Sequence, residues 1–403
     1  LEKNAPRGGF IDYLSLKKSG IIEKNKVVLI DKNDFKKIKY EHTKVNDIWK
    51  IFYWGNEHDF KLISSIRRFK LLKEYCDLEN CAQGYKEANK SKPNDWLSEY
   101  LEMPVKYFNQ KFESFDLTKI DDSKKLKPIP KLIEARGKQG LYNGLRILIK
   151  RGIAQKNINP KGQVIARVES DRFAFRHSII CIKLNSESTI DYTTTTGIMW
   201  SSLFRYYMFM TASTWGTWRE EIHLNEVLDF PIANPSKSEA AQIGKIVKSL
   251  QEEQQNNDQF FTLKDERKLR SLEEELDNKV FDLYRLTPFE RTLIRNRCNY
   301  DIDYYYRGTK SLANEPIKEE SELEGYIESF GSNWSLSLEP HEYFDSSMLI
   351  SADKSMLGVV FMLRSGKEEN NLNYNDNPNI DEFESLLRNK VSKNVYTEGL
   401  FRQ

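Results

Sequence analysis

The chain has 403 residues, of which 30% are charged and 39% hydrophobic, and its formal net charge is +2. This length allows several domains with cores of their own. Because no apolar run approaches the roughly 18 residues of a membrane span, we expect a soluble, cytoplasmic protein without a membrane partner.

Residues 1–75 are predicted to form the edge of an α/β unit. The apolar run at 26–31, KVVLID, is rich in β-branched residues and indicates a strand, whereas residues 59–72 repeat apolar residues at helical spacing. The start of the chain, Leu1 to Phe10, lacks the apolar core of a signal peptide. We therefore interpret it as the interior of a domain and expect the chain to be a fragment.

A second region, residues 76–235, is predicted to be β-rich with helices. It begins with an irregular, polar stretch that contains Pro93 and Pro104. Alternating apolar and polar residues then indicate strands, and an amphipathic helix follows before two prolines end the region. The predicted strands lie within 144–152, 163–169 and 173–184, the helix within 194–212, and the end near Pro231 and Pro235.

Residues 236–310 are predicted to form an antiparallel helical spacer. Two charged, amphipathic segments, 236–256 and 264–286, are separated by a turn rich in Gln and Asn. A third helix is predicted to start at Pro288, because Thr287 and Glu290 have the spacing of a capping box.

Charge is distributed unevenly along the chain. From Lys124 to Val168 twelve Lys or Arg stand against one acid, whereas residues 311–403 hold seventeen acids against eight bases. Such asymmetry indicates one face for a polyanion and another held away from it; a merely solvated basic surface is the alternative. With a predicted strand at 355–363 and helix at 382–391, the acidic segment is expected to be a small C-terminal α/β appendage. The predicted fold class of the chain is α+β.

The four cysteines and five histidines are scattered along the chain. None of the close spacings that indicate a zinc site or a disulfide framework occurs among them. We therefore expect reduced, buried thiols and no metal site.

Arginine and lysine recur at the polar positions of the predicted strands and in the segment before them. Guanidinium groups in a row can neutralise phosphates or, where one reaches a base edge, make a bidentate contact with guanine. Phosphate contact is the commoner outcome, by about two to one. The candidate DNA-binding residues of this segment are Arg136, Lys138, Lys150, Arg151, Lys161, Arg167, Arg172 and Arg176.

A second candidate cluster follows the predicted helix. Trp215 and Trp218 flank Gly216, and Arg219 comes next. This arrangement places flat apolar surface and a charge on one turn, suited to packing on sugars or wedging at a base step. The alternative is that the tryptophans are core residues, which we favour for Trp218 and weigh equally for Trp215. Trp215 and Arg219 complete the candidate DNA-binding residues.

Patterns that carry methyl-transfer chemistry are absent from the sequence. No Gly-x-Gly occurs, although a Rossmann-like donor site needs a glycine-rich turn. No two prolines are adjacent, although the base-holding loop of amino-methyltransferases commonly contains such a pair. There is also no zinc-protease helix, nucleophile elbow or phosphate loop. We assign no catalytic residue and no cofactor to this chain.

Residues 129–232 resemble the C-terminal target-recognition domain of large adenine-specific DNA methyltransferases of the type IIG restriction-modification group. The resemblance rests on IKRGI (149–153), FRHSIICIKL (175–184), WSSLFRYYMFMTASTWGTWREEIHLNEVLDFPI (200–232) and LDNKVFDLYRLTPFER (276–291). The last segment is also similar to the spacer of type I specificity subunits. Residues 48–63 are similar to the linker that follows the catalytic domain. Together the segments cover somewhat over half the chain.

The resemblance implies sequence-specific recognition of double-stranded DNA, so that a catalytic domain, in cis or in trans, methylates adenine with S-adenosylmethionine in restriction-modification or phage defence. It implies that residues 1–75 end or follow the catalytic domain, 76–235 recognise the target, 236–310 form the spacer and 311–403 form the acidic appendage. The alternative is a non-catalytic specificity or adaptor subunit that recruits a methyltransferase or another partner.

We expect the chain on its own not to bind S-adenosylmethionine, because it has neither the glycine turn nor the proline loop. Isothermal titration calorimetry with the donor at micromolar concentrations checks this. A saturable heat of binding would contradict it.

Overall fold

The computed structural model describes residues 9–15, 34–87, 91–108, 126–153, 162–257, 263–311, 313, 338, 341–350, 357–366 and 373–375. The predicted strand at 26–31, the predicted helix at 382–391 and the candidate Lys161 lie outside these residues. Helices and several small sheets occur together, which confirms the predicted α+β class. None of the helices in the described ranges is long and apolar enough to cross a membrane.

The chain divides into two compact units, Leu1–Glu315 and Pro316–Gln403. The predicted boundaries at 75 and 235 fall inside the first unit, whose main hydrophobic core runs from Ile38 to Ile302. The predicted boundary at 310 lies close to the division between the units. All four cysteines are buried and unbridged.

The first unit begins with a two-stranded antiparallel sheet and two helices. Asn56 and Asp59 form a capping box that starts the second helix, which ends at Ile66 although the periodic pattern continues to 72. The elements are β1 Phe10–Leu14, β2 Phe35–Lys39, the 3-10 turn η1 Tyr40–Lys44, α2 Ile48–Trp54 and α3 Glu57–Ile66.

The described residues of the segment from 72 to 142 form single turns and two-residue strands, in agreement with the irregular pattern predicted from residue 76 onward. β4 pairs with β7 and β5 with β6, so that its distant parts are tied together in antiparallel fashion. The elements are η2 Leu72–Tyr75, η3 Leu78–Asn80, β3 Ala82–Gln83, β4 Lys92–Pro93, η4 Asp95–Glu99, β5 Leu101–Glu102, η5 Val105–Tyr107, β6 Lys127–Pro128, β7 Leu132–Ile133 and η6 Gln139–Tyr142.

A four-stranded antiparallel sheet with the order β3-β10-β8-β9 forms the framework of the predicted recognition region. Its three longer strands lie inside the three predicted strand segments, which confirms them. Both faces of the sheet are buried: Ile147 and Ile149 belong to the main core, whereas Leu148 between them belongs to a second core formed by the irregular segment. The longer strands are β8 Arg146–Lys150, β9 Ala166–Glu169 and β10 Ile179–Ile182.

The single helix predicted over 194–212 is two helices, α5 Tyr192–Trp200 and α6 Ser202–Thr211. The chain is extended at Ser201, which ends the first helix and caps the second, because its hydroxyl accepts the Phe204 N–H at 3.4 Å. Trp200 Nε1 donates to the Ala166 carbonyl at 2.7 Å and so attaches α5 to β9. A short helix, α7 Leu224–Leu228, follows.

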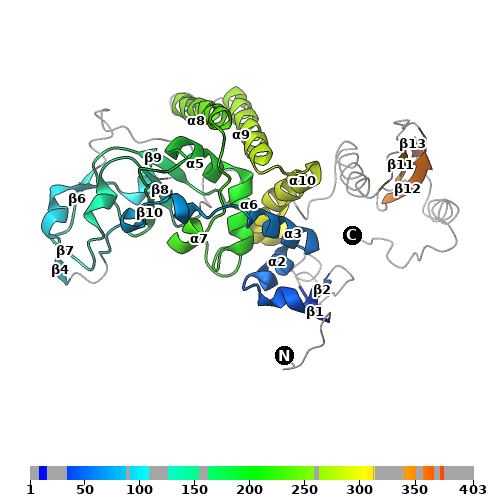
Figure 1. Ribbon diagram of the computed structural model, residues 1–403, viewed down its shortest axis with the longest axis horizontal. Helices are drawn as coiled ribbons and strands as arrows, with labels where there is room; N and C mark the ends of the chain where they lie inside the picture. Colours follow the sequence, from blue (N-terminus) through cyan, green and yellow to red (C-terminus); the bar gives the residue numbers. More distant parts are fainter. Residues whose placement is uncertain are drawn as a thin grey trace. The chain divides into compact units, whose positions relative to one another are not determined.

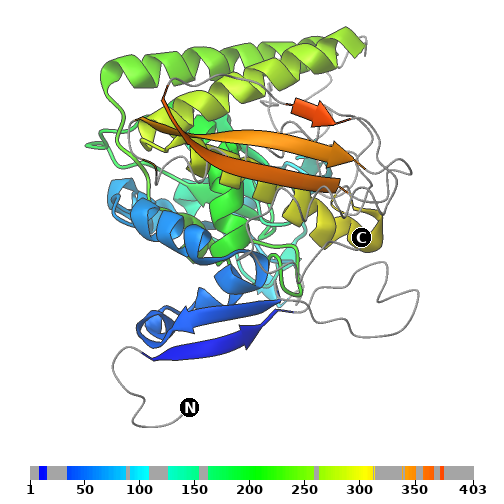
Figure 2. The same cartoon turned by 90° about the vertical axis from the view of Figure 1, so that its right-hand side faces the viewer.

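The helix pair predicted for 236–286 is confirmed as α8 Lys237–Asn257 and α9 Leu263–Leu283. The two helices lie side by side (Figures 1 and 2) and bury Ile243, Val247 and Leu276 in the main core. Ser202 at the start of α6 donates from its N–H and its hydroxyl to the Asp277 carboxylate at 2.7 and 2.6 Å. The hairpin is therefore fixed to α6.

The predicted capping box of Thr287 and Glu290 is confirmed at the start of α10 Pro288–Asn296. The chain continues through a π-helical turn, η7 Arg297–Asp301, into α11 Ile302–Arg307 and the 3-10 turn η8 Gly308–Lys310.

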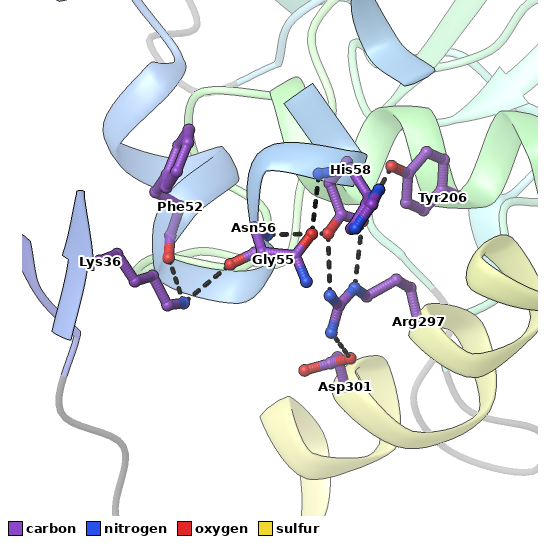
Figure 3. Close-up of polar contacts among 9 residues, drawn as sticks. Lys36, Phe52, Gly55, Asn56, His58, Tyr206, Arg297 and Asp301 are labelled. Carbon is purple, nitrogen blue, oxygen red and sulfur yellow. Dashed lines mark hydrogen bonds and ion pairs between the residues drawn. The ribbon is translucent and has the colours of Figure 1, made fainter. Parts of the chain in front are cut away.

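A buried carboxylate joins three distant parts of the first unit (Figure 3). Asp59 in α3 is fully buried and accepts hydrogen bonds from the Asn56 N–H at 2.8 Å and the Tyr206 hydroxyl of α6 at 3.0 Å. Arg297 Nη2 in the π-helical turn donates to it at 2.8 Å and Nη1 donates to Asp301 at 2.9 Å. The buried charge is thus paired and its lone pairs are occupied.

The second unit contains a three-stranded sheet with the order β12-β11-β13. β12 Leu357–Ser365 overlaps the predicted strand at 355–363 and pairs in antiparallel fashion with β11 Glu342–Ile350, which was not predicted. β13 Asn373–Asn375 pairs with β11 in parallel fashion.

Substitutions at two glycines test how the α8–α9 hairpin packs on α5. A Cβ at Gly197 in α5 would lie 2.7 Å from Ile243 Cγ2 and 2.9 Å from Val247 Cγ2, whereas a Cβ at Gly244 in α8 would meet nothing closer than 3.8 Å. We expect Gly197→Ala to lower the free energy of unfolding by about 1–3 kcal/mol through overpacking. The control Gly244→Ala should raise it by up to about 1 kcal/mol through helix propensity. Urea unfolding measures both; equal effects would mean that the hairpin does not pack on α5 in this way.

Candidate nucleic-acid interface

The candidate Arg167 on β9 is fully buried. Its guanidinium lies 3.7 Å from the centre of the Phe108 ring, donates to the Tyr107 carbonyl at 2.9 Å and is 3.5 Å from a Glu169 carboxylate oxygen. The interpretation of the strands as having a solvent-facing arginine row is therefore wrong for Arg167, because the segment around Phe108 covers this face of the sheet. A phosphate contact by Arg167 is not available in this fold.

Four further candidate arginines form ion pairs with acids from other segments. Arg151 Nη2 lies 2.8 Å from a Glu221 oxygen and Arg176 Nε lies 2.8 Å from Glu102, whose hydrogen bond raises the pKa of Arg176. The other two pairs are Arg136 with Asp95, and Arg172 with Glu99 at 3.2 Å, while the Arg172 guanidinium also lies 4.5 Å from the centre of the Tyr100 ring. Much of the basic charge predicted for this region is therefore neutralised within the chain.

The two candidate lysines within the described residues differ in their surroundings. Lys138 is exposed, directly before the turn η6. Lys150 at the end of β8 is partly buried, and burial, helped by the charge of Arg167, lowers its pKa. Lys138 is thus the better placed of the two to meet an anion.

The two tryptophans have different surroundings, and the core position favoured for Trp218 is wrong. Trp215 is fully buried, packs edge-on against Phe209 and donates from Nε1 to the Tyr306 hydroxyl at 3.0 Å, so it is a core residue. Trp218, for which the core was favoured, is 67% exposed. The sequence does not indicate which of the two indoles is buried, because Trp215 and Trp218 lie in the same turn, one before and one after Gly216.

Trp218 and Arg219 together form an exposed aromatic and cationic pair. The Arg219 guanidinium lies 4.4 Å from the centre of the Trp218 ring, and neither side chain is tied to an acid among the residues that the structure describes. The pair borders an open surface pocket lined by Gly152, Ile153, Trp218, Arg219, Glu220 and Glu221. We call residues 214–221 the Trp218 turn.

The Trp218 turn is held by its own backbone. The Thr214 carbonyl accepts the N–H groups of Thr217, Trp218 and Arg219 at 3.1–3.2 Å. Gly216 has a φ of +79°, and a Cβ there would lie 2.9 Å from the Phe209 ring, so the position requires glycine. The far side of the turn pairs with the end of the sheet through a bridge between Gly152 and Glu221.

Helix α2 supports the turn from below with two side-chain donors that the sequence did not reveal. Lys50 Nζ donates to the carbonyls of Ala212 and Trp215, and Trp54 Nε1 donates to the Gly216 carbonyl at 2.8 Å. Burial lowers the pKa of Lys50 to about 7, against the opposing charges of Glu226 and Asp47. The conformation of the turn therefore depends on a segment more than 150 positions earlier in the chain.

These features suit binding of a polyanion with flat groups. An exposed indole offers a stacking or wedging surface, and the neighbouring guanidinium offers a phosphate or base-edge contact. Within the described ranges no group of three His, Cys, Asp or Glu side chains is placed to hold a metal ion.

No protein-family model matches this chain, and no curated protein matches it.

The lowered pKa of Lys50 predicts a pH dependence of stability. The unfolded chain takes up a proton at this amine below about pH 10.4, but the folded chain does so only below about pH 7. Between these values the unfolded state binds more protons, so stability should rise with pH, at up to about 1.4 kcal/mol per pH unit for one proton.

Urea unfolding at several pH values from 7 to 9.5 measures this slope. Lys50→Met should remove it, whereas Lys245→Met, at an exposed lysine of α8, should leave it unchanged. The same slope in wild type and Lys50→Met would show that the Lys50 amine is not buried in the folded chain.

Proposed function

We propose that this chain recognises a specific sequence in double-stranded DNA on behalf of an adenine-specific methyltransferase. The catalytic domain, with S-adenosylmethionine, is supplied in cis or in trans, and the methylation serves restriction-modification or phage defence. The observation that carries the proposal is the exposed Trp218–Arg219 pair on a turn that glycine, a backbone network and α2 hold in place. The resemblance of residues 129–232 to target-recognition domains agrees with it.

The Trp218 turn combines an exposed aromatic side chain with a backbone that is held in place. An indole that is 67% exposed is not part of the core, and its flat apolar face is available to a base or a sugar. A turn with a fixed backbone presents the indole and guanidinium with little loss of conformational entropy on binding. Lys138, exposed and in the basic part of the sequence, supplies a further cation for phosphates.

In this proposal the α8–α9 hairpin is the spacer. It is fixed to the recognition region through Asp277 and through the close approach of α5 at Gly197. Such a helix pair holds two modules at a constant distance, as recognition of separated parts of a DNA site requires.

One observation favours a second function. The ion pairs of Arg136, Arg151, Arg172 and Arg176 leave fewer cations for phosphates than the sequence suggested. This agrees with a protein-interaction adaptor, in which the arginines tie the irregular segment to the sheet and the exposed Trp218 contacts a protein.

Substitutions in the Trp218 turn distinguish the two functions. Trp218→Ala should weaken binding to the selected duplex by about tenfold or more, since loss of a base or sugar contact by an aromatic residue costs roughly 1–3 kcal/mol. If Arg219 contacts a phosphate, Arg219→Ala should reduce the slope of log K against log salt concentration by about one unit. If Arg219 instead contacts a base, the variant should lose most of the preference for one base at a single position. Selection from a random duplex pool, followed by fluorescence anisotropy at several salt concentrations, measures both.

The controls are Trp49→Ala and Arg68→Ala, which change an exposed tryptophan of α2 and an exposed arginine after α3. Trp215→Ala should instead lower the melting temperature, because it empties a buried site at a cost of about 3–5 kcal/mol. If wild type selects no sequence, or if both turn variants bind DNA like the controls, the adaptor function takes the place of DNA recognition.

A further inference from the structure

Glu220 lines the pocket beside Trp218 and Arg219. The Glu220 backbone carbonyl accepts the Ile153 N–H at 2.8 Å, which fixes the position of the residue. The side chain is partly buried, and burial raises its pKa. Among the residues that the structure describes, no cation pairs with it and no donor hydrogen-bonds to it.

Among the residues that the structure describes, the acid next to Glu220 already has a partner of its own. Glu221 is paired with Arg151. On α11, burial and then the negative charge of Glu220 raise the pKa values of Tyr305 and Tyr306. The Glu220 side chain is partly open to solvent, and a carboxylate that lines a pocket without a described partner is available as a hydrogen-bond acceptor. It therefore points to a ligand that brings a hydrogen-bond donor.

The nature of that donor follows from where Glu220 lies. A carboxylate repels phosphate, so in a DNA complex Glu220 is excluded from the backbone and suited to a base edge. In the major groove only cytosine N4 and adenine N6 are donors, whereas guanine and thymine present acceptors. Arg219, the adjacent residue, offsets the negative charge and is free to contact phosphate or guanine.

We propose that Glu220 is a specificity-determining residue, whose carboxylate accepts a hydrogen bond from the exocyclic amino group of cytosine or adenine and excludes guanine and thymine at that position. The inference rests on the proposed function in DNA recognition. In this proposal the pocket beside Trp218 receives the edge of one base that carries the amino group.

Selection from a random duplex pool tests the assignment. Wild type and the control Glu252→Gln, at an exposed carboxylate of α8, should select a motif in which one position admits only amino bases on the contacted strand. Glu220→Gln has the same shape but its amide both donates and accepts. This variant should therefore admit guanine or thymine at that position, with discrimination reduced about tenfold and every other position unchanged.

Deletion of the single amino group sharpens the test. The selected cytosine is replaced by 2-pyrimidinone, or the selected adenine by purine, and affinity is measured for wild type, Glu252→Gln, Glu220→Gln and Glu220→Ala. Loss of the amino group should reduce the DNA affinity of wild type and the control by about tenfold more than it reduces the affinity of Glu220→Ala. The reason is that Glu220→Ala has already lost the acceptor. Melting curves establish that each variant is folded.

The outcomes separate the two proposals. If wild type selects a sequence but Glu220→Gln and Glu220→Ala select the same motif with unchanged ratios, the role of Glu220 is overturned and DNA recognition stands. If the two base analogues weaken Glu220→Ala as much as wild type, the amino contact belongs to another residue and the assignment is likewise overturned. If wild type selects no sequence at all, the proposed function fails and this inference fails with it.

Discussion

The buried pair of Asp59 and Arg297 determines how the helical part of the first unit is assembled. Desolvating both charges is expensive, and removal of one partner from such a pair usually costs about 3–5 kcal/mol. Hydrogen bonds compensate this desolvation only when α3, Tyr206 of α6 and the π-helical turn lie in their observed positions. Gly55 belongs to the same constraint, since a Cβ there would collide with the Asp59 carboxylate. Because α2 precedes this glycine, the pair also fixes the helix that carries Lys50 and Trp54 beneath the Trp218 turn.

The sheet has a complementary role. Its strands are short, and such a sheet depends for its stability on the packing of other segments against its faces. Here the main core covers one face and the irregular segment from 72 to 142 covers the other. The described residues of that segment form little regular structure, and the ion pairs and rings that surround Arg167, Arg172 and Arg176 attach them to the sheet. Arginine in this region thus stabilises the fold to a greater extent than the charge pattern alone indicates.

Local signals in the sequence predicted local structure well. The hairpin follows from amphipathic periodicity, the start of α10 from Thr287 and Glu290, and the three longer strands from alternation and flanking turns. The surroundings of Arg167, Trp215 and Trp218 could not be predicted, because a segment distant in sequence decides which face is covered. The same holds for Lys50 and Glu220, because a lysine on a helix and a glutamate after Arg219 are ordinary in sequence. Only the tertiary structure makes Lys50 a buried donor and places Glu220 in the lining of a pocket.

The position of Lys50 links proton binding to the occupancy of the turn. Its amine contacts the carbonyls of Ala212 and Trp215, and its pKa lies near neutrality. A polyanion seated on the Trp218 turn would raise that pKa, so binding near pH 7 would take up a fraction of a proton from the buffer. By thermodynamic reciprocity, protonation of Lys50 would strengthen the binding by the same free energy. The heat of association would then depend on the ionisation enthalpy of the buffer. The protonation state of the buried Lys50 would thus respond to a ligand bound on the Trp218 turn.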